Sequence, residues 1–127
     1  MEIRLVVLKE LQKDKRPLRQ LFWLACLFVA TLMLLPADFL PSDSTFSLWD
    51  KFQHFVAFAG LCLVGSWAYP DQSYALMLKL LVFGGAIEIM QHATGWRYME
   101  FLDFVANIIG IIIGRWIFHL CKNSKSD

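Results

Sequence analysis

Charged residues are scarce in this sequence. Asp, Glu, Lys and Arg make up 18% of its 127 residues, whereas soluble domains average about 25%. Apolar residues make up 57%, above the roughly 45–50% of soluble domains, and the mean hydropathy is +0.50. A soluble core of this size cannot hide so many large side chains, and the excess would form an exposed patch. The composition therefore argues against a cytosolic enzyme and favours a single-domain membrane protein.

Cysteine is also rare. The chain has three, Cys26, Cys62 and Cys121, and no C-x-x-C pair. An odd count without paired spacing supports neither a disulfide framework nor a zinc knuckle. We therefore expect the cysteines to be small buried apolar residues, and the sequence predicts no cofactor and no resident metal.

No linker is long enough to divide the chain into domains, but proline and polar residues separate four apolar segments. They cover 21–35, 52–69, 74–93 and 101–121. A membrane-spanning helix needs about 20 residues, so the first segment is short unless it starts near Leu18 or continues past Pro36. Because the last two links are short, successive helices must be antiparallel neighbours.

These segments predict an all-α fold, an integral membrane four-helix bundle over 20–121 with a basic amphipathic segment at 1–19 and a polar tail at 122–127. Half of the 12 basic residues lie in the N-terminal segment, namely Arg4, Lys9, Lys13, Lys15, Arg16 and Arg19. Basic residues that alternate with apolar ones suit a helix lying on the anionic inner leaflet. Since basic residues mark the cytoplasmic side of a membrane, we expect both termini in the cytoplasm. Because the basic segment lies directly before an apolar run, we expect it to contact the membrane surface and expect no nucleic-acid partner.

This topology brings the polar residues of three spans to the outer end of the bundle. Helical spacing puts Asp50 and His54 on one face, and Glu88, Gln91 and His92 on another. The expected set is Asp50, Lys51, His54, Glu88, Gln91, His92, Arg97, Glu100, Asp103 and Asn107. Ionisable groups near the bilayer are costly and usually mark a site or a paired network. The sequence therefore predicts an outward-facing polar pocket.

Roles follow from the chemistry of these side chains. Glu88 and His54 are the candidate acid and base, because a carboxylate–histidine pair can move a proton. Lys51 and Arg97 are the candidate anion ligands for the phosphate or carboxylate of a lipid headgroup. The remaining candidate binding residues are Asp50, Gln91, Asp103 and Asn107. Glu88, Asp103 and the histidines His54 and His92 could also ligate a divalent metal, with Glu88 and His92 at i, i+4 spacing, but no H-E-x-x-H motif is present.

A stripe of small residues continues the polar face of the last span. Gly110 and Gly114 form a G-x-x-x-G motif, which lets another helix approach closely. We expect this stripe to face the interior of the bundle, and it also offers a contact for a homo-oligomer.

The order of these motifs resembles the VanZ-like family of small bacterial membrane proteins. Asp50-Lys51-x-x-His54 opens one span, Glu88-x-x-Gln91 closes the next, and Asp103-x-x-x-Asn107 opens the last. The resemblance covers about half of the chain, and its motif positions are Asp50, Lys51, His54, Glu88, Gln91, Arg97, Asp103 and Asn107. It implies a multi-spanning protein of the bacterial cytoplasmic membrane. The family is named for a member associated with resistance to teicoplanin, and no reaction is attached to it.

Three functions remain open from the sequence. The first is a VanZ-like pocket that binds or modifies an anionic envelope lipid or a lipid-linked cell-wall intermediate, with a link to glycopeptide resistance. The second is a non-enzymatic membrane scaffold or partner subunit in which the polar residues lock the fold. The third is a metal-dependent lipid hydrolase.

Overall fold

The structure, a computed structural model, describes residues 2–36, 44–95 and 99–124, and the regular secondary structure in these ranges is entirely α-helical. The helices are α1 (Glu2–Lys13), α2 (Arg16–Met33), α3 (Ser44–Ala68), α4 (Ser73–Ala93) and α5 (Phe101–Ser124). The predicted all-α fold class is confirmed at this level.

The boundary between the N-terminal segment and the bundle lies earlier than predicted. α1 ends at Lys13, and α2 already begins at Arg16, so residues 16–19 are part of α2. Pro17 lies in the first turn of α2, where its missing N–H leaves no helical hydrogen bond unmade. The early start gives α2 18 residues, but the added residues include Arg16 and Arg19, and α2 is not one of the two described helices long and apolar enough to cross a membrane. At the other terminus α5 continues to Ser124, so the predicted polar tail begins as helix.

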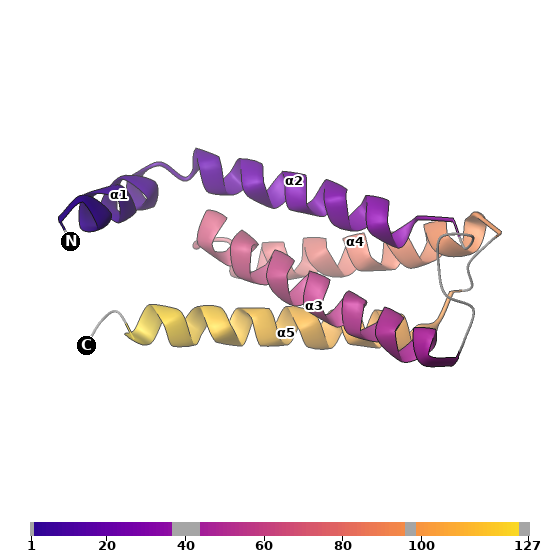
Figure 1. Ribbon diagram of the computed structural model, residues 1–127. Coiled ribbons are helices and arrows are strands. Elements are labelled where there is room, and N and C mark those ends of the chain that lie inside the picture. Colours follow the sequence, from indigo (N-terminus) through magenta and orange to yellow (C-terminus); the bar gives the residue numbers. More distant parts are fainter. Residues whose placement is uncertain (1, 37–43, 96–98, 125–127) are drawn as a thin grey trace.

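The four long helices lie side by side, and α1 extends beyond the start of α2 (Figure 1). α1 and the last turn of α5 lie at one end, which we call the inner end; the opposite end is the outer end. α3 contacts each of the other three long helices, and its contact with α5 is the most extensive in the bundle. Both α3 and α5 run from the outer to the inner end, so this main contact is parallel, although successive helices are antiparallel as predicted.

Two glycines allow the parallel pair to pack closely. A Cβ atom at Gly110 would collide with the backbone carbonyl of Phe55, and one at Gly114 would collide with that of Ala59. The small-residue stripe therefore faces the bundle interior, where it brings the backbones of α5 and α3 together. Because α3 already occupies this face, a second copy of the chain cannot pack on the same glycines. The homo-oligomer contact expected through Gly110 and Gly114 is therefore not available.

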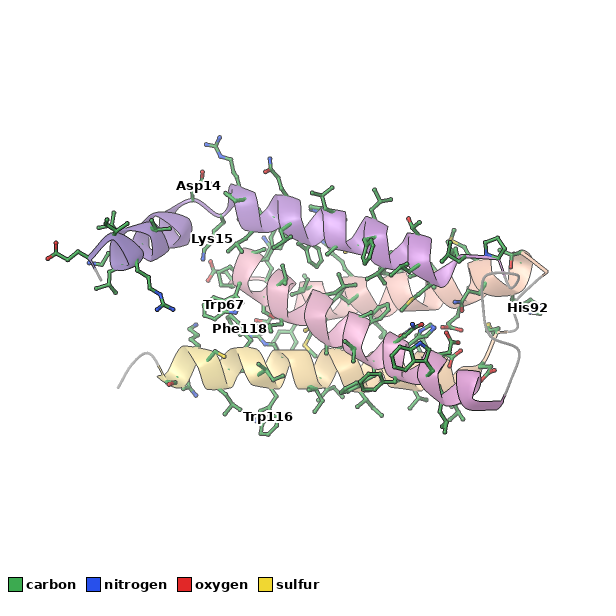
Figure 2. The ribbon with its side chains drawn as sticks, viewed as in Figure 1. Asp14, Lys15, Trp67, His92, Trp116 and Phe118 are labelled. Carbon is green, nitrogen blue, oxygen red and sulfur yellow. The ribbon has the colours of Figure 1, made fainter. Side chains whose placement is uncertain are left out.

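The inner half of the bundle has an apolar core with one embedded cation. Trp67 of α3 meets Phe118 of α5 edge-on, with ring centroids 4.9 Å apart (Figure 2). The guanidinium of Arg115 lies 4.9 Å from the centroid of the Phe118 ring and donates hydrogen bonds to the hydroxyls of Ser66 and Ser73. Arg115 thus joins α5 to the end of α3 and the start of α4.

The exterior of the bundle is apolar as well. Exposed side chains along α4 and α5 include Leu78, Val82, Ile89, Ile109, Ile112 and Trp116, and Trp116 points away from the bundle in Figure 2. Within the described ranges, α4 and α5 are the two helices long and apolar enough to cross a membrane. Only 28% and 33% of their most apolar stretches are buried inside the structure. They therefore present apolar surface along their length, unlike the core helix of a soluble protein.

We predict that Gly110→Ala destabilises the protein while Gly60→Ala does not. The new methyl group at residue 110 meets the α3 backbone, whereas a Cβ at Gly60 meets nothing within 4 Å. Overpacking costs about 1–3 kcal/mol, which lowers Tm by several degrees. Thermal unfolding of the detergent-purified variants measures the difference, and equal Tm values for both would contradict the close α3–α5 contact.

Candidate functional site

Polar side chains from three helices meet at the outer end of the bundle. On α3, Asp50 lies one turn before His54, and on α5, Asp103 lies one turn before Asn107. Because the two helices are parallel, the two pairs face each other in the same order. Glu88 of α4 joins them, and we call these five residues the polar cluster. Their exposed fractions are 8% (Asp50), 0% (His54), 2% (Glu88), 2% (Asp103) and 1% (Asn107).

His54 lies at the centre of the polar cluster. Its Nδ1–H donates to Oδ1 of Asn107 at 2.9 Å, and the same nitrogen lies 3.4 Å from Oε1 of Glu88. The imidazole therefore connects α3 with both α5 and α4. Gly84, one turn before Glu88, leaves room for this arrangement, since a Cβ there would lie 3.0 Å from Nδ2 of Asn107.

Lys51 forms the rim of the site. Its ammonium group donates to Glu100 and lies 3.4 Å from Oδ1 of Asp103. The side chain of Lys51 is 20% exposed and that of Glu100 is 47% exposed, whereas Asp103 is buried. The ion pair between Lys51 and Glu100 thus lies at the partly exposed edge of the polar cluster.

Three other predicted site residues, Gln91, His92 and Arg97, are not part of the polar cluster as described. Gln91 is buried, but its side-chain amide donates to the backbone carbonyl of Met33 at 2.7 Å, which joins α4 to the end of α2. His92 is exposed at the outer end of α4 and does not join the polar cluster (Figure 2). The predicted metal pair of Glu88 and His92 is therefore wrong, because only Glu88 faces the interior. Arg97 lies outside the described residues.

A groove between α2 and α3 has one residue of the polar cluster, Asp50, in its lining. It has a volume of about 380 Å³ and is lined by Phe28, Val29, Leu32, Met33, Leu35, Trp49, Asp50, Phe52, Gln53, Val56 and Ala57. Asp50 belongs both to this groove and to the polar cluster. Sequence reasoning missed the groove, because it arises from the packing of α2 on α3 rather than from any motif.

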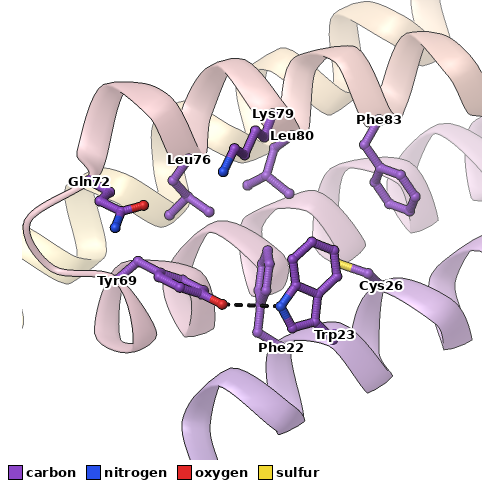
Figure 3. Close-up of a pocket in the computed structure, with 9 residues that line it drawn as sticks. All are labelled: Phe22, Trp23, Cys26, Tyr69, Gln72, Leu76, Lys79, Leu80 and Phe83. Atoms are coloured by element: carbon purple, nitrogen blue, oxygen red, sulfur yellow. Dashed lines mark hydrogen bonds between the residues drawn. The ribbon is translucent and has the colours of Figure 1, made fainter. Parts of the chain in front are cut away.

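A second cavity lies in the inner half, between α2, α4 and the turn that joins α3 to α4 (Figure 3). Its walls are mostly apolar, and the indole N–H of Trp23 donates to the Tyr69 hydroxyl across it at 3.1 Å. Arg19 lies 4.8 Å from the centroid of the Tyr69 ring and donates to the backbone carbonyl of Ala68. Lys79 is the cationic residue in the lining, and the lining contains no carboxylate. The outer site is therefore the better candidate for chemistry.

The polar cluster offers two kinds of chemistry. Nδ1 of His54 lies 3.4 Å from Oε1 of Glu88, so the two side chains form an ion pair when the imidazole is protonated. In addition, one ligand atom each of Asp50, His54 and Asp103 lies within 4.8 Å of the other two, which is a geometry that can hold a metal ion. Comparison with family models, with curated proteins and with solved structures finds no match. The resemblance to the VanZ-like family therefore stays a prediction from the motifs.

We predict that Gln91→Leu lowers Tm more than Gln20→Leu does. The first change leaves the buried carbonyl of Met33 without the amide that bonds it, at a cost of about 1–3 kcal/mol. Gln20 is exposed on α2, so its replacement removes no buried contact. Thermal unfolding in detergent checks the pair. Unchanged stability of Gln91→Leu would mean that the amide is not needed to join α4 to α2.

Proposed function

We propose that the protein is a VanZ-like integral membrane protein that binds or modifies an anionic amphiphile at its outer polar site. The amphiphile belongs to the class of envelope lipids and lipid-linked cell-wall intermediates. The single observation that carries the proposal is the groove between α2 and α3, because its mostly apolar lining also includes Asp50 of the polar cluster.

The groove suits a hydrocarbon chain. Its lining side chains Phe28, Leu32 and Val56 are also large exposed apolar residues, so the groove is open to whatever surrounds the bundle. Ligand sites typically have volumes of about 300–1,000 Å³, and the groove falls in this range. A lipid that lies along α2 and α3 would bring its headgroup to the level of Asp50.

The rim suits a phosphate. Lys51 is the described cation nearest the polar cluster, and its partner Glu100 is nearly half exposed. Exposed ion pairs are weak, at about 0–1 kcal/mol, so Lys51 can exchange Glu100 for a lipid phosphate at little cost. Arg97 is the second proposed anion ligand, on the basis of the motif alone. In this scheme His54 and Glu88 would move a proton if the bound lipid is modified.

The same proposal includes four membrane spans and cytoplasmic termini. By length and apolar composition, α4 and α5 can each cross a membrane. α2 and α3 lie beside them and carry exposed apolar side chains such as Leu24, Leu27 and Val56. Lys51 lies near the outer end of α3, where its long side chain can reach the membrane interface, whereas Asp50 is buried in the polar cluster. A bacterial cytoplasmic membrane follows from the family resemblance.

A scaffold role is the second candidate, and one observation favours it. The buried hydrogen bond between His54 and Asn107 joins the two helices that share the most extensive contact. A polar residue buried at a helix contact can fix the register of the pair. On this account the polar cluster serves the fold and has no ligand.

We predict that Glu88→Gln and His54→Ala each abolish the function in a complemented deletion strain while the membrane abundance of the protein stays normal. Lipid analysis of the strain measures the function, since the substrate or bound lipid should change in amount. His92→Ala is the matched control, because His92 is exposed at the same end of the bundle.

The scaffold account predicts a different outcome for the same variants. Breaking a buried pair costs about 3–5 kcal/mol, so Glu88→Gln should then lower abundance together with phenotype. Normal lipid composition in both the Glu88→Gln and His54→Ala strains would contradict the binding proposal outright.

We predict the orientation from reporter fusions as well. An alkaline phosphatase fused after Gly95, at the outer end of α4, should be active, because the enzyme folds only outside the cytoplasm. The same reporter fused after Asp127 should be inactive. Activity of the fusion after Asp127 would reverse the predicted topology and put the polar cluster on the cytoplasmic side.

A further inference from the structure

Three residues of the polar cluster have the arrangement of a metal site. Asp50 and His54 come from successive turns of α3, and Asp103 comes from the facing turn of α5. One ligand atom of each lies within 4.8 Å of the other two. We propose that Asp50, His54 and Asp103 bind a divalent transition-metal ion such as Zn²⁺ or Mn²⁺. The inference rests on these side chains alone and does not depend on the proposed lipid.

The hydrogen bonding of His54 leaves one ring nitrogen available as a metal ligand. The amide oxygen of Asn107 can only accept a hydrogen bond, so the ring proton lies on Nδ1. In the neutral ring this leaves Nε2 with a lone pair. Nε2 is fully buried and has no hydrogen-bond partner among the residues that the structure describes. A buried nitrogen without a partner is costly, and a metal ion would remove that cost.

The contacts of Nδ1 have the form of outer support for a metal ligand. Histidines that bind metals almost always donate their other ring N–H to a carboxylate or a carbonyl oxygen. Here Asn107 accepts that proton at 2.9 Å, and Glu88 lies 3.4 Å from the same nitrogen. These contacts fix both the tautomer and the orientation of the ring.

The charge around the site also favours a cation. The carboxylates of Asp50, Glu88, Glu100 and Asp103 gather at the outer end, and Lys51 pairs with Glu100 and Asp103. Among the described residues of this group, four are carboxylates and Lys51 is the one permanently charged cation. A divalent ion at Asp50 and Asp103 would balance two of these negative charges.

The donor set selects the class of ion. Mg²⁺ and Ca²⁺ prefer oxygen ligands, whereas imidazole suits Zn²⁺ and other transition metals. Two carboxylates and one imidazole give three protein ligands, which leaves a coordination position for water or for an oxygen of a ligand. The site would therefore be of the open kind rather than of the closed structural kind.

Metal titration of the full-length protein in detergent tests the assignment. The purified protein is stripped with EDTA and then titrated separately with Zn²⁺, Mn²⁺ and Mg²⁺ by calorimetry, with bound metal counted by elemental analysis. We expect one equivalent of Zn²⁺ or Mn²⁺ per chain, a higher Tm with the ion, and no comparable effect of Mg²⁺. Detergent without added lipid keeps the result separate from the lipid proposal.

Two variants and one control locate the ion. His54→Gln and Asp103→Asn should each weaken metal binding about 10-fold to 100-fold. Asp103→Asn leaves the hydrogen bond between His54 and Asn107 in place, so it tests the site even if His54→Gln misfolds. His92→Gln removes an exposed histidine of the same end and should bind like the unmodified chain. Absence of stoichiometric binding by the folded chain, or unchanged affinity in the folded variants, would overturn the assignment.

Discussion

The close packing of α5 on α3 at Gly110 and Gly114 is the contact on which the rest of the structure depends. A side chain at either glycine would meet the backbone of α3, so the two helices lie together only because these residues have none. Asp103, Asn107, Gly110 and Gly114 lie on one stripe of α5. The contact at the glycines therefore also places Asp103 and Asn107 close to Asp50 and His54 of α3. Close packing in the middle of the bundle thus buries charge at its outer end.

Burial of charge at that end requires an explanation in terms of stability or function. Carboxylates that are nearly fully buried are costly unless partners offset their charge. Lys51 supplies part of the compensation at the rim, and His54 connects Glu88 to Asn107 in the interior. A bound divalent ion would supply more. It would also give a lipid phosphate a positive partner in a site where carboxylates alone would repel it.

The sequence predicted much of this site because helical spacing specifies which side chains share a face. The pairs of Asp50 with His54 and of Asp103 with Asn107 follow from that rule and are confirmed. His92 was placed wrongly, since the buried stripe of α4 includes Gly84, Glu88 and Gln91, and the next residue turns away from it.

Other features depend on contacts between helices that are distant in the sequence. Short links predict antiparallel neighbours but say nothing of α3 and α5, which α4 separates, so their parallel contact could not be foreseen. The groove at Asp50 has the same origin, because α2 supplies one wall and α3 the other. From their charge, Arg16 and Arg19 were assigned to the N-terminal surface segment. Both belong to α2, because this helix begins before the apolar run at residue 21.

Native mass spectrometry of the detergent-purified protein tests the central claim, that the outer site takes a lipid through the groove. Val56 lines the groove and is 48% exposed, so Val56→Trp should fill the groove without changing the core. Val82→Trp adds the same ring to α4 at a residue that is 64% exposed and outside the groove. The account predicts a co-purified phosphate-bearing lipid in the unmodified chain and in Val82→Trp, and its loss in Val56→Trp. Equal lipid retention by both variants, or no retained lipid in the unmodified chain, would contradict it.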